Sequence, residues 1–341
     1  MSTNMNNFLE STNNIRELID DLKSVCANYG LGNDGNEFKI ITQIFLYKFL
    51  NDKFIYEIKN TNEKIKSNEG LEKYLFDLKG FIVIKNALSK KEVKDCNQII
   101  DKIKNTPSNE WNGNVHSKGN IEQHGVELQQ IYEAGKPFEN LINHSSWINH
   151  MKHFVGGEGT FDYNHGPLFI DENFVNVRGP GKAIPVHSGA HEGTQRGHYR
   201  YQNGKFHCGQ INILVALSKI SKGDGGTVII PGSHKSNLKH PQFDKYKLKK
   251  DGKYKTADSM IVSEEVYLNA GDAMLFVDSL CHGSSRRVNK GERRVVIYRY
   301  GPSWGFFRNS YRPSKELLNR LSKTQRKIVM PHEEVLSPKK N

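Results

Sequence analysis

Short apolar runs separated by Gly, Asn and Pro fill the chain from about residue 161 onward, and they constrain its fold more than any other feature. Four of these runs are Gln210–Leu217, Thr227–Ile230, Ala273–Val277 and Arg294–Tyr298. Runs of this length, rich in β-branched residues and closely spaced between turn residues, are typical of an antiparallel sandwich or barrel. The sequence therefore predicts a mainly β core for this half of the chain.

The first 70 residues show helical periodicity instead. An apolar stripe at helical spacing is followed by a glycine-rich break at residues 30–35, a second helical segment at 38–58 and a polar linker at 59–73. The stripe consists of Ile15, Leu18, Ile19, Leu22 and Val25. Residues 1–70 are therefore expected to form an N-terminal helical extension. The segment resembles the helical region of bacterial DNA-adenine methyltransferase subunits, although none of their catalytic motifs follows it.

Turn and helix-capping residues mark both ends of the β-rich domain, which is expected to span residues 76–305. A turn at Gly80 precedes a short strand, and Ser89 and Glu92 form a capping box that begins a helix. After Pro313, a basic amphipathic helix with Ser314 as its N-cap is expected. Residues 306–341 are accordingly predicted to be a basic helical tail.

Net charge is strongly positive and unevenly placed. The chain carries 49 Lys and Arg against 37 Asp and Glu, and its last 56 residues alone hold 15 of the basic residues against 4 acidic ones. Such a stretch favours anionic partners, among them phosphorylated metabolites, a coenzyme A arm, nucleic acid and an acidic lipid surface. A solvated basic face that binds nothing explains the same charge, and the sequence leaves both interpretations open.

The spacing of the four cysteines and the hydropathy of the chain indicate its cellular compartment. Cys26, Cys96, Cys208 and Cys281 lie far apart without a CxxC pair, which favours free thiols in a reducing compartment over a disulfide scaffold or a zinc site. No apolar run approaches the roughly 20 residues that span a bilayer, and residues 1–14 lack the apolar core of a secretion signal. A cytoplasmic protein without a membrane span is expected.

Three motifs whose side chains are suited to binding a metal or a carboxylate follow one another in the β-rich half. His187-Ser188-Gly189 comes first, His282-Gly283-Ser284 follows at the end of an apolar run, and Arg293 lies 11 residues after His282. Two neutral imidazoles are suitable ligands for a ferrous ion that keeps positions open for other ligands. An arginine offers a bidentate grip on a carboxylate, to which a serine hydroxyl can add a hydrogen bond.

Longer stretches around these residues resemble the phytanoyl-CoA dioxygenase family of Fe(II)- and 2-oxoglutarate-dependent oxygenases. The likeness covers about residues 76–304. Its segments are Phe76–Val93, the Gly-Asp-Gly-Gly turn and Pro-Gly-Ser-His-Lys-Ser-Asn loop within Gly223–Asn237, Gly271–Phe276, His282-Gly283 and Glu292–Arg294. The resemblance implies a double-stranded β-helix, that is a cupin-like jelly roll, with flanking helices. It also implies Fe(II), 2-oxoglutarate and O₂ as cofactors.

Site residues can be carried over from the same resemblance. His187 and His282 would be the iron ligands, and Arg293 with Ser284 would hold the 5-carboxylate of 2-oxoglutarate. His234 lies in the Pro-Gly-Ser-His turn, which is a structural loop in the family, and it is therefore expected to be structural.

Gly189 departs from the family pattern, because it occupies the aspartate position of a His-x-Asp metal motif. Three interpretations are open. Gly189 leaves a coordination position for chloride or bromide, as in iron-dependent halogenases; or Glu192 or Asp278 supplies the missing carboxylate of a hydroxylase; or the metal site is degenerate.

These observations leave three classes of function, of which the last is a plain cupin-like structural protein. The first is oxidative functionalisation of a C–H bond, by hydroxylation or halogenation, in a small and conceivably anionic substrate, phosphorylated or linked to coenzyme A. The second is a nucleic-acid-associated or recognition module with a degenerate metal site, although the chain lacks a recognisable nucleic-acid-binding signature.

Overall fold

A computed structural model describes residues 19–32, 35–64, 69–118, 125–156, 165–181, 183–249, 255–305, 307–308 and 311–332. The chain divides into two compact units, Met1–Glu69 and Gly70–Asn341. In the first unit, residues 19–28 are helical and α2 spans Gly35–Lys64. Part of the expected stripe, Ile15 and Leu18, lies outside the described residues.

The linker expected at residues 59–73 is wrong for most of its described part. The helix α2 continues to Lys64, and α3 (Glu69–Lys79) begins shortly afterwards. Residues 59–64 are polar, but they contain neither Gly nor Pro, and Lys and Glu are good helix formers. Polarity alone therefore did not mark a helix end here.

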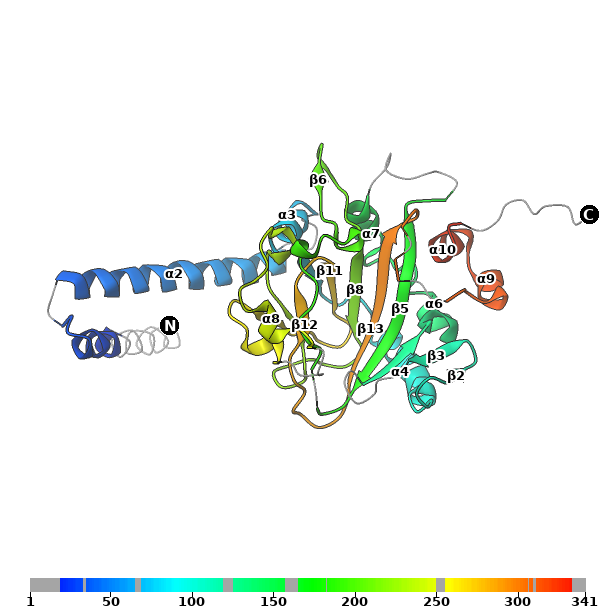
Figure 1. Ribbon diagram of the computed structural model, residues 1–341, viewed down its shortest axis with the longest axis horizontal. Coiled ribbons are helices and arrows are strands. Elements are labelled where there is room, and N and C mark those ends of the chain that lie inside the picture. Colours follow the sequence, from blue (N-terminus) through cyan, green and yellow to red (C-terminus); the bar gives the residue numbers. More distant parts are fainter. Residues whose placement is uncertain are drawn as a thin grey trace, which may run out of the picture. The chain divides into compact units, whose positions relative to one another are not determined.

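The second unit is built on one large sheet with the strand order β1-β11-β8-β13-β5-β4-β3-β2 (Figure 1). In that order the strands span Phe81–Ile84, Ala273–Val277, Ile211–Ala216, Arg293–Pro302, Leu168–Arg178, Val126–Gln129, Val115–Lys118 and Trp111–Asn112. All neighbouring pairs are antiparallel. The predicted runs at 210–217, 273–277 and 294–298 correspond to β8, β11 and β13.

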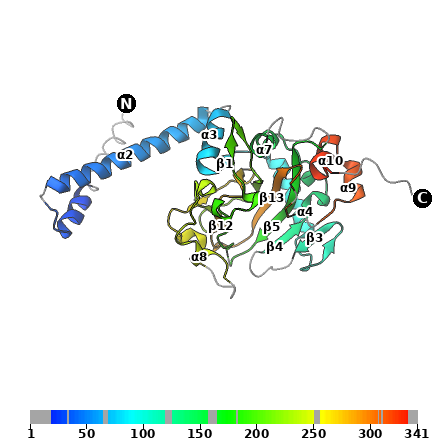
Figure 2. The same cartoon turned by 45° about the horizontal axis from the view of Figure 1, so that its top comes forward.

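A smaller antiparallel sheet of β10 (Glu264–Val266), β9 (Thr227–Ile229) and β12 (His282–Ser284) forms the second layer (Figure 2). The hairpin of β6 (Tyr201–Gln202) and β7 (Lys205–Phe206) stands apart from both sheets. Two antiparallel sheets with flanking helices confirm the predicted double-stranded β-helix.

Strand β13 positions the site, because it lies between β8 and β5 and pairs with both. Side chains alternate between the two faces of a strand, so residues two apart share a face. Arg293, Val295, Ile297 and Arg299 all line the cavity between the sheets. The register shifts between Arg299 and Tyr300, immediately after the last of these residues.

Helices flank the two sheets, and local signals begin several of them. They are α4 (Lys90–Ile103), α6 (Lys136–Glu139), α7 (Ile148–Val155), α8 (Phe243–Tyr246), α9 (Lys315–Arg320) and α10 (Lys323–Val329). The expected capping box of Ser89 and Glu92 begins α4, whose buried face carries Val93, Cys96 and Ile100. Short 3-10 turns join other elements: η1 (Ile131–Ala134), η2 (Ala190–Glu192), η3 (Gln195–Gly197), η4 (Ser233–Lys235) and η5 (Ala257–Ser259).

The single helix expected after Pro313 is wrong in one respect. Ser314 does cap a helix, but that helix ends at Arg320, and Ser322 begins α10 with a capping box of its own. A serine that offers its hydroxyl to the backbone competes with helix continuation, which accounts for the break. Apolar residues of both helices, including Leu317 and Ile328, join the core of the second unit. We retain the division at residues 70, 76, 305 and 306 as a proposal.

All four cysteines are free and buried. Within the described part of the chain, no helix combines the length and apolarity that crossing a membrane requires.

Candidate metal and 2-oxoglutarate site

The two predicted metal ligands face each other across the edge of the small sheet. His187 and His282 form an isolated antiparallel bridge, in which each backbone N–H donates to the carbonyl of the other at 2.9 and 3.1 Å. Their imidazole rings are 4.1 Å apart between centroids. Two residues separated by 95 positions in the sequence are thus held side by side by backbone pairing.

The ring nitrogens of both histidines are already oriented. The Nδ1 atom of His187 lies 2.9 Å from the Pro185 carbonyl oxygen, and that of His282 lies 2.6 Å from the Leu280 carbonyl oxygen. Because a carbonyl can only accept, each Nδ1 carries the proton and each Nε2 keeps its lone pair. Burial lowers the pKa of His187 to about 4 and that of His282 well below its usual value, so both rings are neutral near pH 7.

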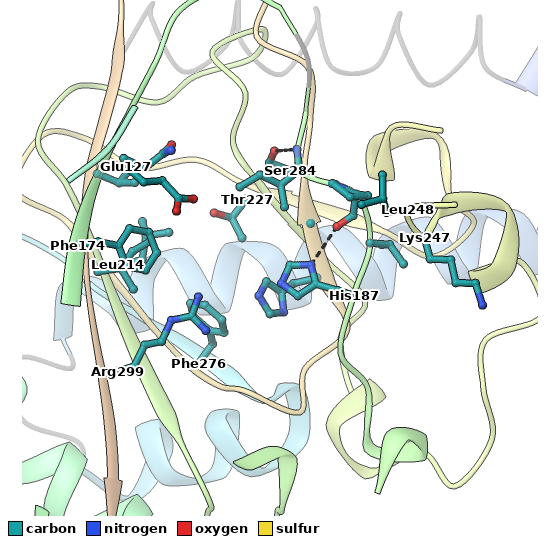
Figure 3. A pocket seen from close by; sticks show the side chains of 18 of the residues that line it. Glu127, Phe174, His187, Leu214, Thr227, Lys247, Leu248, Phe276, Ser284 and Arg299 are labelled. Carbon is teal, nitrogen blue, oxygen red and sulfur yellow. Dashed lines mark hydrogen bonds between the residues drawn. The ribbon is translucent and has the colours of Figure 1, made fainter. Parts of the chain in front are cut away.

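A cavity of about 630 Å³ opens between the two sheets beside this pair (Figure 3). Its walls are apolar at Phe174, Leu214 and Phe276, and polar groups lie among them. The remaining described lining residues are Lys118, Glu127, Asn176, Ile184, Pro185, Val186, His187, Glu192, Thr227, Phe243, Lys247, Leu248, His282, Gly283, Ser284, Arg293, Val295, Ile297 and Arg299.

Arg293 lines this cavity as a buried cation without a counter-ion among the described residues. It is 2% exposed, and its hydrogen bonds to Asn176 Oδ1 and Thr227 Oγ1 are long, at 3.4 and 3.5 Å. Its Nε atom has no hydrogen-bond partner within the described chain. Burial, together with the charges of Arg178 and Arg287, lowers the pKa of Arg293 well below its usual value. A buried guanidinium with long hydrogen bonds and no counter-ion is suited to bind the carboxylate of a ligand.

Ser284 lies at the same end of the cavity, and its hydroxyl oxygen is already used. It accepts hydrogen bonds from Arg178 Nη1 and from the Ile184 backbone N–H, both at 2.7 Å. The hydroxyl proton therefore remains to be donated, as a carboxylate ligand requires. The structure thus brings together all four predicted ligand residues around one cavity.

Sequence reasoning missed two polar residues at this end, Asn176 on β5 and Thr227 on β9, which contact Arg293. The run at 227–230 was identified as a strand, and alternation places Thr227 on the same face as Ile229. Nothing in the sequence pattern marks Asn176 as facing Arg293, because the two residues are 117 positions apart.

Comparison with known proteins gives the family. Residues 76–295 match the family described as phytanoyl-CoA dioxygenase (PhyH). The chain belongs to this family. The family uses Fe(II), 2-oxoglutarate and O₂, so the predicted cofactors and the dioxygenase class are confirmed at family level.

Individual relatives of this PhyH-family chain are distant. Dioxygenase cdmD from Talaromyces verruculosus is 33% identical over 91 residues, which are 27% of this chain and 24% of that protein. The matched stretch thus spans about a quarter of the curated relative.

Among solved structures, HygX from Streptomyces hygroscopicus with nickel and 2-oxoglutarate bound has a TM-score of 0.55 and 19% identity, and the match covers 74% of this chain and 94% of HygX. HygX with nickel, 2-oxoglutarate and hygromycin B has a TM-score of 0.56 at 20% identity, covering 72% of this chain and 93% of HygX. These likenesses show a shared fold.

The backbone at Gly189, the position that was expected to lack the metal-binding aspartate, explains why a side chain is difficult to accommodate there. Gly189 has a φ of +132°, which side chains of L-residues rarely permit. A Cβ atom added at this position would lie 2.5 Å from Nδ1 and 2.6 Å from Cε1 of His191. The imidazole of His191 therefore occupies the direction that a carboxylate side chain would take.

Among the described residues, neither Glu192 nor Asp278 forms a three-residue metal-binding group with the two histidines. Within the described residues, no group of three or more His, Cys, Asp and Glu side chains could hold a metal ion. Asp278 is committed elsewhere, since Arg196, Arg299 and Arg308 surround its carboxylate at 3.0 to 3.5 Å. Glu192 lines the cavity on an exposed 3-10 turn. The structure therefore places the two imidazoles side by side as candidate donors, with no third candidate grouped with them among the described residues.

His234 has the structural role that was expected. It is 1% exposed, and its Nε2 atom lies 3.0 Å from the Asp77 carbonyl oxygen, where it ties the η4 turn to α3.

Replacing Gly189 tests whether the glycine is required by the backbone. Gly189→Ala is expected to destabilise the protein by about 1–3 kcal/mol, because the φ is strained and the methyl group meets His191. Denaturant unfolding measures this loss. Gly179→Ala is the matched control, since its added Cβ meets nothing within 4 Å and its φ is ordinary. Equal stability of the two variants would show that Gly189 is under no constraint.

Proposed function

We propose that this chain is an Fe(II)- and 2-oxoglutarate-dependent oxygenase that functionalises a C–H bond of a small molecule. The observation that carries this proposal is made around one cavity: two imidazoles whose Nε2 atoms are free, and a buried arginine that has no counter-ion, among the residues that the structure describes. Family membership supports the same conclusion.

Each group has a distinct task in this proposal. His187 and His282 hold the iron through Nε2, and their backbone partners keep the rings from turning. Arg293 and Ser284 bind the distal carboxylate of 2-oxoglutarate. Bound iron would activate O₂, which oxidises 2-oxoglutarate to succinate and CO₂ by two electrons and a C–H bond of the substrate by two more. The apolar wall of Leu214 and Phe276 keeps water away from the reacting substrate carbon.

Hydroxylation and halogenation would differ in the ligand that takes the coordination position left without a carboxylate by Gly189. A donor set of two imidazoles leaves one more position to an exchangeable ligand, which is either water or a halide such as chloride or bromide. The positive φ at Gly189 and the close approach of His191 support a coordination position that no side chain at residue 189 fills. Halogenation is therefore our second candidate, and hydroxylation with water at that position is the first.

An anaerobic titration of the apoprotein with Fe(II) and 2-oxoglutarate, with and without chloride, separates these outcomes. We expect a visible charge-transfer band that is lost in His187→Ala and His282→Ala. A band that shifts with chloride favours halogenation, and a band insensitive to chloride favours hydroxylation. Absence of any band in the wild-type protein contradicts the oxygenase proposal.

The basic C-terminal stretch supports nucleic-acid binding less than its net charge suggested. Several of its arginines pair with carboxylates of the fold itself, namely Arg287 with Asp224, Arg294 with Asp101 and Glu292, Arg299 with Glu172, Arg308 with Asp278 and Arg320 with Glu139. Much of the positive charge is thus internal. We propose a small-molecule substrate, and HygX, which shares the fold, binds one.

A further inference from the structure

Glu127 is the one carboxylate that Figure 3 labels in the cavity wall, and the proposed reaction gives it no task. It lies on β4, opposite Asn176 of β5 on one side and Lys118 of β3 on the other. Directly opposite residues of antiparallel strands have Cβ atoms about 4.5–5.5 Å apart. Asn176 also contacts Arg293, the proposed 2-oxoglutarate anchor. Only strand β5 therefore separates Glu127 on β4 from Arg293 on β13.

The carboxylate of Glu127 is half-buried, and it forms no ion pair with any described residue at 4 Å or less. Burial raises its pKa, an effect that the nearby charge of Glu172 reinforces and those of Lys118 and Arg299 oppose. Gln129 hydrogen-bonds to this carboxylate, but no cation pairs with it among the described residues, so it can still bind a ligand group that donates a hydrogen bond.

Arg299, the other arginine of β13 that lines the cavity, is in a different situation. Its guanidinium is compensated by Glu172 at 3.2 Å and Asp278 at 3.5 Å, and it lies over the ring of Phe174. Arg293 is assigned to 2-oxoglutarate in our proposed function. Lys118, opposite Glu127 on β3, is exposed, so its ammonium group stays hydrated. The half-buried charged group that remains for a second ligand in this part of the cavity wall is therefore the Glu127 carboxylate.

We propose that Glu127 binds the substrate of the oxygenase proposed above, and that this substrate carries an amine or hydroxyl group that donates a hydrogen bond to the Glu127 carboxylate. An ammonium group gives the strongest contact, because both partners are then charged. A phosphate or a carboxylate of a substrate is repelled at this position. This inference reverses the anionic substrate that the basic tail led us to expect.

Matched fragments test the chemical class without knowledge of the substrate. The full-length protein is loaded with 2-oxoglutarate and Zn(II), which does not react with O₂, and is titrated with hexylamine, hexanol and hexanoate by ligand-observed NMR. These three probes share a six-carbon chain that suits the apolar wall and differ only in the head group. We expect hexylamine to bind about tenfold more tightly than hexanoate, with hexanol between them.

Two variants give the readout its specificity. In Glu127→Gln the preference for hexylamine over hexanoate is expected to vanish, whereas Glu110→Gln, an exposed carboxylate outside the cavity, keeps it. Equal binding of the three probes to the wild-type protein, tighter binding of hexanoate, no binding of any probe, or an unchanged preference in Glu127→Gln overturns the inference. A 2-oxoglutarate titration of the same samples separates the two proposals. If 2-oxoglutarate binds and the head-group preference is absent, only the assignment of Glu127 is wrong.

Discussion

Arg293→Leu is expected to weaken 2-oxoglutarate binding about 10²–10³-fold, which corresponds to about 3–4 kcal/mol. The guanidinium of Arg293 is the group at its end of the cavity that can neutralise the distal carboxylate, and it is fully desolvated. Removing one partner of a buried charged pair leaves the other partner buried and unpaired. Isothermal titration of the Zn(II)-loaded protein with 2-oxoglutarate measures the loss.

The same substitution is expected to leave the apoprotein at least as stable as the wild type. In the absence of 2-oxoglutarate, Arg293 is a buried cation whose two hydrogen bonds are long, so its desolvation is poorly compensated. Leucine removes that cost. Arg286→Leu, at an exposed arginine seven residues earlier, is the control and should change neither stability nor 2-oxoglutarate binding. A clear loss of stability in Arg293→Leu would show that the arginine is structural.

Asp278→Asn is expected to destabilise the protein by about 3–5 kcal/mol, because it leaves several buried or half-buried arginines without their shared anion. Asp278 is 1% exposed and accepts from Arg196 Nε at 3.0 Å and from Arg308 Nη2 at 3.1 Å, with Arg299 Nη1 at 3.5 Å. These arginines come from η3, from β13 and from the segment after β13. Denaturant unfolding measures the expected loss.

The pH dependence of stability gives a second test of Asp278. Burial by itself raises the pKa of this carboxyl, but the charges of Arg308 and Arg299 outweigh burial and lower the pKa to about 2. A lowered folded-state pKa stabilises the protein above the unfolded value of about 3.9, and the contribution is lost as the pH falls toward 2. Asp278→Asn should therefore flatten the stability profile in this window.

Asp244 provides the matched control for Asp278. Hydrogen bonds from Lys239 and Lys247 lower its pKa to about 2 as well, but this carboxylate is on the surface, where solvent screens the interaction. Asp244→Asn should leave the unfolding midpoint unchanged at pH 7. Equal effects of the two substitutions would show that the arginine cluster around Asp278 adds nothing to stability.

Local patterns predicted the parts of the fold that depend on neighbours in sequence. The strand near Ala273, the capping box at Ser89 and the cap at Ser314 all follow from residues within a few positions of one another. The break of the C-terminal helix at Ser322 was missed, although the Ser-x-x-Gln signal that marks it is also local. It was overlooked because the apolar spacing runs through the break.

Contacts between distant strands set the limit of what the sequence could predict. His187, His282 and Arg293 were identified through a family resemblance, since spacing alone does not bring residues 95 positions apart together. The inward direction of Glu127 depends on the register of β4 against β5, which no local pattern encodes. The engagement of Asp278 by arginines likewise depends on three separate segments that meet only in the folded chain.

Strand β13 restricts which insertions and deletions this protein can tolerate. Arg293 and Arg299 are six residues apart on one face, so the strand holds them about 20 Å apart. Deleting one residue between them would turn one of the two arginines away from the cavity, whereas a deletion of two would keep both inward and shorten their separation. The register shift after Arg299 allows length changes nearer Pro302 to be absorbed without moving either arginine. Related chains are therefore expected to vary in length beyond the bulge and to keep the spacing before it.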